Sequence, residues 1–122
     1  MNFSKMMDLA AKTFLKYGTV QVVDIGANPL GGNPPYQPMI DRGLCHVIGF
    51  EPQKKPYEEL IALNHPNATY INSAIGDGKT HALYCYKGSG LSSFFPLRQE
   101  SIDTLQFGGH ELVAMEEIET VK

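Results

Sequence analysis

Hydrophobic and polar residues follow two different periods along the chain, and each period predicts its own kind of element. Near the N-terminus, apolar residues recur every three or four positions within residues 1–18, so they share one face of a helix that Gly18 can end. These residues are Phe3, Met6, Met7, Ala10, Ala11, Phe14 and Leu15. We expect this leading helix to cover the core. The next apolar run, TVQVVDI at 19–25, lacks alternation and predicts a strand buried on both faces of a parallel sheet.

Two helices and two strands are predicted to follow this first strand. YQPMIDRG at 36–43 can form a short helix, and HVIGF at 46–50 is a second buried strand. QKKPYEELIALN at 53–64 predicts a crossover helix with Pro56 in its first turn, where proline is tolerated. Three apolar residues of this helix are expected to face the sheet: Tyr57, Leu60 and Ile61. ATYINSAI at 68–75 is a third strand, which GDGK ends.

This order of elements predicts an α/β fold with a doubly wound, Rossmann-like sheet. Strand, helix, strand, helix, strand is the mononucleotide-binding half of such a fold, and right-handed crossovers give strand order 3-2-1. From residue 79 the pattern changes, because THALYCYKG and HELVAMEEIETVK read as further strands, with the loop SGLSSFFP between them and no further crossover helix. We therefore expect a single, partial domain. Its parts are the leading helix 1–18, the β-α-β-α-β half 19–78, and extra strands and a loop 79–122.

Composition and charge narrow the classes of ligand. A chain of 122 residues with 43% hydrophobic and 19% charged residues is an ordinary globular protein. Its net charge of -3 leaves no broad basic surface for nucleic acid or anionic lipid, so a small-molecule ligand is expected. There is no apolar run long enough to span a membrane and no signal-peptide core. Cys45 and Cys85 fit reduced thiols, which predicts a cytoplasmic location, and no His or Cys spacing indicates a metal site.

The glycine loop after the first strand, DIGANPLGGN, can be compared with three nucleotide-binding templates. Gly26 and Gly31 have the glycine spacing of an ATP-binding phosphate loop, but Gly32 and Asn33 replace its lysine and hydroxyl residue. The dinucleotide fingerprint needs a glycine where Asn28 stands, which disfavours NAD and FAD without excluding them. The third template, an acid followed by G-x-N, makes no demand for phosphate contacts. It suits a nucleoside that carries an amino-acid tail.

Four motifs carry a resemblance to a known family. VVDIGAN, GFEP, NSAIGDG and GLSSFFP occur in this order over roughly residues 20–97 and resemble the class I S-adenosylmethionine-dependent methyltransferases, within them the FkbM-type family. The resemblance implies S-adenosylmethionine as cofactor and methyl transfer, in this family usually to a hydroxyl oxygen, here of a small molecule or a sugar. The family's acceptor pocket and most catalytic residues are expected beyond residue 122, so we expect negligible activity from this chain alone.

The chemistry of the cofactor selects candidate residues in the first half of the chain. Asp24, at the end of the first strand, can meet the ammonium of the methionine tail directly or through water. Gly26 lets the chain turn tightly enough for Ala27 and Asn28 to pass beside that tail. Glu51, at the end of the second strand, is placed to accept from both ribose hydroxyls, with Pro52 as an apolar neighbour.

Further candidates follow from the resemblance. It places the adenine at Ala74 and Ile75, with Asp77 as acceptor for the exocyclic amine, and it matches Ser92 to the serine pair of the family's loop. Structural alternatives stay open, because Asp77 also suits a turn and Ser92 an ordinary loop. In the same way, Asp24 and Glu51 can be caps of the helices that follow them. His110 is more typical of a solvated residue and is left out of the site.

Two other functions stay open beside the methyltransferase. One is a non-catalytic binding or assembly module that keeps the half-fold, and the other is an NAD-dependent oxidoreductase domain. The strand QVVDI also has no partner strand on one side unless segment 111–121 covers it. Because an open apolar edge is a template for another chain, we expect a homodimer.

Overall fold

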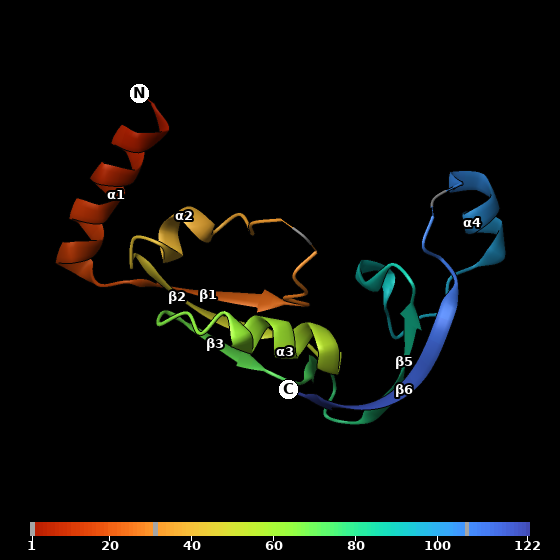
Figure 1. The fold of residues 1–122 in the computed structure, drawn as a ribbon. Coiled ribbons are helices and arrows are strands. Elements are labelled where there is room, and N and C mark those ends of the chain that lie inside the picture. Colours follow the sequence, from red (N-terminus) through yellow and green to blue (C-terminus); the bar gives the residue numbers. More distant parts are fainter. Residues whose placement is uncertain (1, 31, 107) are drawn as a thin grey trace. The chain divides into compact units, whose positions relative to one another are not determined.

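The computed structural model describes residues 2–30, 32–106 and 108–122 (Figure 1). Met1 of the leading segment and Gly31 of the glycine loop lie outside the described residues, as does Phe107. The chain is mixed α/β and forms two compact units, Met1–Asn72 and Ser73–Lys122.

The first unit is built on a parallel three-stranded sheet. Its strands are β1 (Val20–Ile25), β2 (Cys45–Phe50) and β3 (Ala68–Ile71), in the order β1-β2-β3, which confirms the expected 3-2-1 order. Its helices are α1 (Phe3–Tyr17), α2 (Gln37–Ile40) and α3 (Lys54–Ala62). All three strands and all three helices occur close to the positions that the apolar periods predict.

The core of this unit lies at the central strand. Cys45 and Val47 of β2 are fully buried, and Ile40 of α2 packs with them. Partly buried hydrophobic residues surround this cluster: Val22, Tyr36, Met39 and Ala68. The short α2 therefore anchors the long glycine- and proline-rich connection to the middle of the sheet.

Two expectations about burial in the first unit, one for α1 and one for β1, are wrong. In the predicted core-covering helix α1, Met7 is the buried residue, whereas Phe3, Met6 and Leu15 are exposed. Strand β1 is not buried on both faces, since Val23 is 58% exposed. The reason is that β1 is the edge strand, paired within the described residues with β2 alone, so half of its surroundings are missing.

The second crossover helix faces the sheet with fewer residues than expected. Leu60 is buried and Tyr57 is half-buried, but Ile61 is exposed. A helix of nine residues, Lys54–Ala62, presents only a narrow stripe to the sheet. Ile61 lies off that stripe because it directly follows Leu60 in the sequence.

The second unit contains a separate mixed sheet. Its strands are β4 (Ala74–Ile75), β5 (Thr80–Tyr86) and β6 (Leu112–Val121), in the order β4-β6-β5, with β4 parallel and β5 antiparallel to β6. Between β5 and β6 lie a single 3-10 turn, η1 (Ser89–Leu91), and helix α4 (Gln99–Leu105). Strands over 80–88 and 110–122 are confirmed, whereas α4 was not expected.

The predicted third strand, 68–75, is divided between the two units. β3 ends at Ile71, and Ala74–Ile75 form β4, which pairs with the end of β6 through Ala74↔Thr120 and Ile75↔Val121. The Thr120 hydroxyl stabilises this end, because it donates to Lys79 O at 2.9 Å and accepts from Gly78 N at 3.0 Å. The segment 111–121 therefore completes the second sheet and leaves the outer edge of β1 without a strand in the described chain.

Candidate functional site

One row of residues crosses the carboxyl half of the parallel sheet. Asp24 of β1 is in register with Gly49 of β2, and Gly49 is in register with Tyr70 of β3. A Cβ atom at Gly49 would lie 2.6 Å from Tyr70 Cδ1, closer than real Cβ contacts, and 3.0 Å from Ala27 Cβ, which is tighter than most of them. Glycine in the middle of this row therefore gives the Tyr70 ring the space it occupies.

Two tyrosines surround the Asp24 carboxylate. The Tyr36 hydroxyl donates a hydrogen bond to Asp24 Oδ2 at 2.6 Å. Burial, followed by this hydrogen bond, raises the pKa of Tyr36, and burial together with the Asp24 charge raises the pKa of Tyr70 above its ordinary value of 10.0. Both phenols are therefore neutral hydrogen-bond donors at neutral pH.

The turn after β1 directs the glycine loop over this row. Gly26 has φ 80°, a left-handed conformation that glycine adopts without strain. The N–H groups of Gly26 and Ala27 both donate to Phe50 O, at 2.9 and 3.0 Å, which ties the turn to the end of β2. Asn28 follows, and its Nδ2 is buried without a hydrogen-bond acceptor in the described chain.

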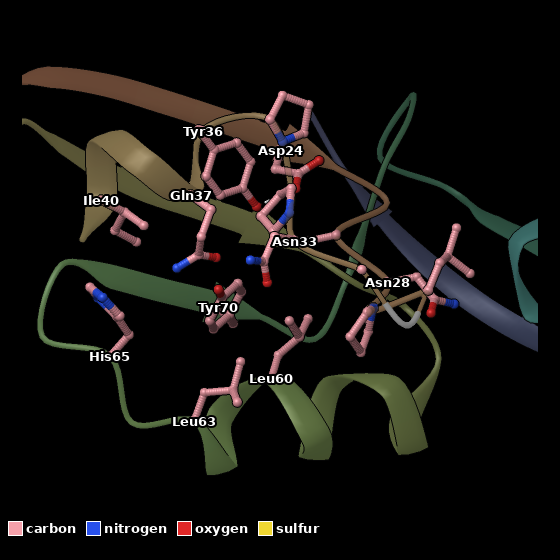
Figure 2. A pocket seen from close by; sticks show the side chains of 16 residues that line it. Asp24, Asn28, Asn33, Tyr36, Gln37, Ile40, Leu60, Leu63, His65 and Tyr70 are labelled. Atoms are coloured by element: carbon pink, nitrogen blue, oxygen red, sulfur yellow. Dashed lines mark hydrogen bonds between the residues drawn. The ribbon is translucent and has the colours of Figure 1, made fainter. Parts of the chain in front are cut away.

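A cavity of about 420 Å³ lies between this loop, α2, α3 and the end of β3 (Figure 2). Asp24, Tyr36, Tyr70 and Asn28 line it together with apolar side chains, and no described lining residue is a lysine or an arginine. The remaining lining residues are Ala27, Pro29, Leu30, Gly32, Asn33, Pro34, Pro35, Gln37, Ile40, Leu60, Leu63 and His65. Its size and apolar walls are typical of a small-molecule site.

Glu51 lies next to this site but does not line the cavity. Its side chain is 1% exposed, and its Oε1 accepts from Gln53 N at 2.8 Å, at the first turn of α3. Burial raises the pKa of Glu51, the bonds from Gln53 oppose this, and the charge of Asp24 raises it further. The Asn72 amide holds the same loop, since it donates to Glu51 O at 2.8 Å and to Pro52 O at 3.1 Å.

Neither acid caps the helix that follows it. Gln53 is the N-cap of α3, and the described residues give α3 no side-chain cap, so the bond from Gln53 N to Glu51 supports the start of α3 without capping it. The N-cap of α2 is Tyr36, and the described residues give α2 no side-chain cap, so Asp24 does not cap that helix. The hydrogen-bond donor to Asp24 is instead a phenol that itself lines the cavity.

The other predicted site residues belong to the second unit. Ala74 is buried and Ile75 half-buried in β4, not at the end of the third strand as expected. Asp77 lies in the turn before β5, where it accepts from Lys79 N at 3.0 Å and bonds His81 Nε2 at 2.7 Å, and His81 lowers the pKa of Asp77. Ser92 Oγ accepts from Tyr86 N at 3.3 Å. These four residues are not part of the lining of the cavity in the first unit.

The sequence pattern does not indicate most of the residues around Asp24. It predicts a strand that contains Tyr70 but no direction for this side chain, and only the pairing of β3 with β2 puts Tyr70 beside Gly49. For Tyr36 it predicts only a place in a short helix. Spacing along the chain contains no signal for the bond between Tyr36 and Asp24, which are twelve residues apart.

Comparison with protein-family models, with curated proteins and with solved structures found no match. In the described part of the chain, no helix is long and apolar enough to cross a membrane. The same part contains no group of three or more His, Cys, Asp or Glu side chains that could hold a metal ion. Fold and site thus define a mixed α/β chain with a cavity of about 420 Å³ at the carboxyl half of a parallel sheet.

Proposed function

We propose that this chain is the cofactor-binding part of an S-adenosylmethionine-dependent methyltransferase of the FkbM type, which transfers a methyl group to a hydroxyl of a small molecule or sugar. The order β1-β2-β3 supports this proposal, because open parallel sheets bind ligands at the carboxyl ends of their strands. Asp24 and Glu51 occupy those ends on neighbouring strands, close enough for the charge of Asp24 to raise the pKa of Glu51.

The observation that carries the proposal is a pair of polar side chains in the lining of the cavity, Asp24 and Asn28. Asp24 is a carboxylate without a basic partner in the described chain, and Asn28 Nδ2 is a buried donor without an acceptor. A buried polar group that makes no hydrogen bond costs about 1–3 kcal/mol. The methionine tail of S-adenosylmethionine would place its ammonium on Asp24. Its carboxylate would accept from Asn28 Nδ2 if the glycine loop moves to expose this buried atom.

Glu51 is the proposed acceptor for the ribose hydroxyls, with Pro52 beside it. Because Glu51 is 1% exposed and bonded to Gln53 N, this role requires the start of α3 to move when the cofactor binds. The adenine at Ala74 and Ile75, with Asp77 and Ser92, stays a prediction from the resemblance. So do the negligible activity of this chain alone and the cytoplasmic location.

Calorimetry with S-adenosylhomocysteine, NAD and ATP tests the proposal. We expect S-adenosylhomocysteine to bind most tightly, and we expect Glu51→Gln to weaken it at least about tenfold, since a hydrogen bond to a charged group contributes ~1.5–3 kcal/mol. Glu59→Gln, which removes the same charge from an exposed position on α3, is the matched control. Tighter binding of NAD than of S-adenosylhomocysteine would favour an oxidoreductase domain and overturn the proposal. Binding of S-adenosylhomocysteine without methyl transfer by any longer form of the chain would favour a binding module.

We also propose that the chain forms a two-fold homodimer through β1. The described chain offers this strand one partner only, and Val23 and Ile25 on it are 58% and 65% exposed. Two copies paired edge to edge would satisfy the free N–H and C=O groups of both strands. Sedimentation at micromolar concentration should give a dimer, and a monomer over the whole concentration range would refute this pairing.

A further inference from the structure

The cavity around Asp24 has the electrostatic character of a cation site. The described chain gives the Asp24 carboxylate a single hydrogen-bond donor, the Tyr36 hydroxyl. Among the described lining residues, His65 could carry a positive charge, but its ring nitrogens lie near Asn67 N, at 3.1 Å, and Asp41 Oδ1, at 3.9 Å, and no contact joins it to Asp24. Since the described lining offers Asp24 no lysine or arginine, a ligand cation could add a charge-assisted hydrogen bond to this carboxylate.

The groups next to Asp24 suit a nitrogen cation attached to an apolar body. Tyr70 lines the cavity, and its hydroxyl has no hydrogen-bond partner in the described chain. The rings of Tyr36 and Tyr70 can also face a cation, because an aromatic face attracts positive charge. Opposite them, Leu60 and Leu63 supply an apolar wall at the end of α3 (Figure 2).

We propose that this cavity binds a primary or secondary amine on a compact apolar body, with the ammonium on Asp24 and the apolar body between Tyr70 and the leucines of α3. Such a ligand uses the part of the cavity formed by α3 and β3. The proposed cofactor would use Asp24 with Asn28 and the glycine loop. Since the amine and the proposed cofactor both need the Asp24 carboxylate, binding of one excludes the other. This mutual exclusion is the one part of the inference that rests on the proposed function.

The direct test compares 2-phenylethylamine with 2-phenylethanol, which has the same shape without the charge. Calorimetry on the whole chain should show the amine binding at least about tenfold more tightly than the alcohol. This is the difference in affinity that one charge-assisted hydrogen bond typically provides. Asp24→Asn should remove this preference. Equal affinity for the two probes, no binding of the amine at millimolar concentration, or a preference that survives in Asp24→Asn would each overturn the proposal.

A second variant tests the place of binding without touching the charge. Leu63 lines the cavity and is 66% exposed, so Leu63→Trp should be tolerated and fill the space, weakening the amine about tenfold. Leu105→Trp, at an equally exposed leucine of α4 outside the lining, is the matched control and should have no effect. If Asp24→Asn does not fold, this pair and the comparison of amine with alcohol decide the question. Unchanged amine affinity in a folded Leu63→Trp variant would refute the site.

The amine and the cofactor can be tested independently. S-adenosylhomocysteine added to the amine complex should displace it, whereas Leu63→Trp should affect the amine and Glu51→Gln the cofactor analogue. Amine binding without cofactor binding would leave this inference standing and overturn the proposed function. Binding of S-adenosylhomocysteine without binding of the amine would overturn this inference and leave the proposed function standing.

Discussion

Gly49→Ala is the most direct test of the row that forms the site. The added methyl group would lie 2.6 and 2.8 Å from Cδ1 and Cε1 of Tyr70 and 3.0 Å from Ala27 Cβ. These atoms belong to a ring near its attachment point and to a side chain that cannot rotate away. Either the Tyr70 ring or the strand has to move.

The expected cost combines two opposing effects. Overpacking of this kind typically costs about 1–3 kcal/mol. Alanine in place of glycine in a strand returns about 0.5–1 kcal/mol, because the unfolded chain loses conformational freedom. We therefore expect Gly49→Ala to lower the free energy of unfolding by about 1–2 kcal/mol, with a fall in Tm of roughly 4 °C for each kcal/mol. Movement of Tyr70 should also weaken binding of the amine.

Urea denaturation followed by far-UV circular dichroism measures this cost. Gly32→Ala is the control, since a Cβ there meets nothing within 4 Å and the residue has no left-handed conformation. In a Tyr70→Ala background most of the clash is gone, so the penalty of Gly49→Ala should largely disappear in a double-mutant cycle. A Gly49→Ala variant as stable as Gly32→Ala, or an equal penalty in the Tyr70→Ala background, would show that the row is packed differently.

Two further predictions concern the loop after β2. Asn72→Ala removes the amide that donates to the carbonyl oxygens of Glu51 and Pro52. The free energy of unfolding should therefore fall by about 1–3 kcal/mol in the urea assay. An unchanged free energy of unfolding would mean that water replaces both hydrogen bonds. Burial raises the pKa of Glu51 above 4.5, so the folded chain holds this proton more tightly than the unfolded chain, and stability should fall as the pH rises from 4.5 through the raised value. Glu51→Gln should gain stability over the unmodified chain across that window, and parallel pH profiles of the two proteins would contradict the burial of this carboxylate.

The sequence by itself determined the order and kind of most elements in the first unit. Apolar periods, prolines and glycines are local signals, and together with the crossover rule they predicted the three strands, the helices between them and the sheet order. The same local signals placed Asp24 and Glu51 at the carboxyl ends of their strands. They also predicted the strands that became β5 and β6.

Helix α4 and the division of the third strand were not available from local signals. QESIDTL has one apolar pair, Ile102 and Leu105, so it shows no amphipathic period. ATYINSAI reads as one apolar run, and only its pairing shows that Ala68–Ile71 joins β2 while Ala74–Ile75 joins β6. Burial was misjudged at α1 and β1 for a related reason, because an apolar face is covered only if another element packs on it.

The site itself depended on tertiary structure. Asp24, Tyr36 and Tyr70 come from a strand end, a proline-rich loop and another strand, and nothing in their spacing joins them. Their meeting depends on the register of three parallel strands and on a glycine between two of them. Strand register is set by hydrogen bonds between residues far apart in the chain, so it is decided only when the whole sheet assembles.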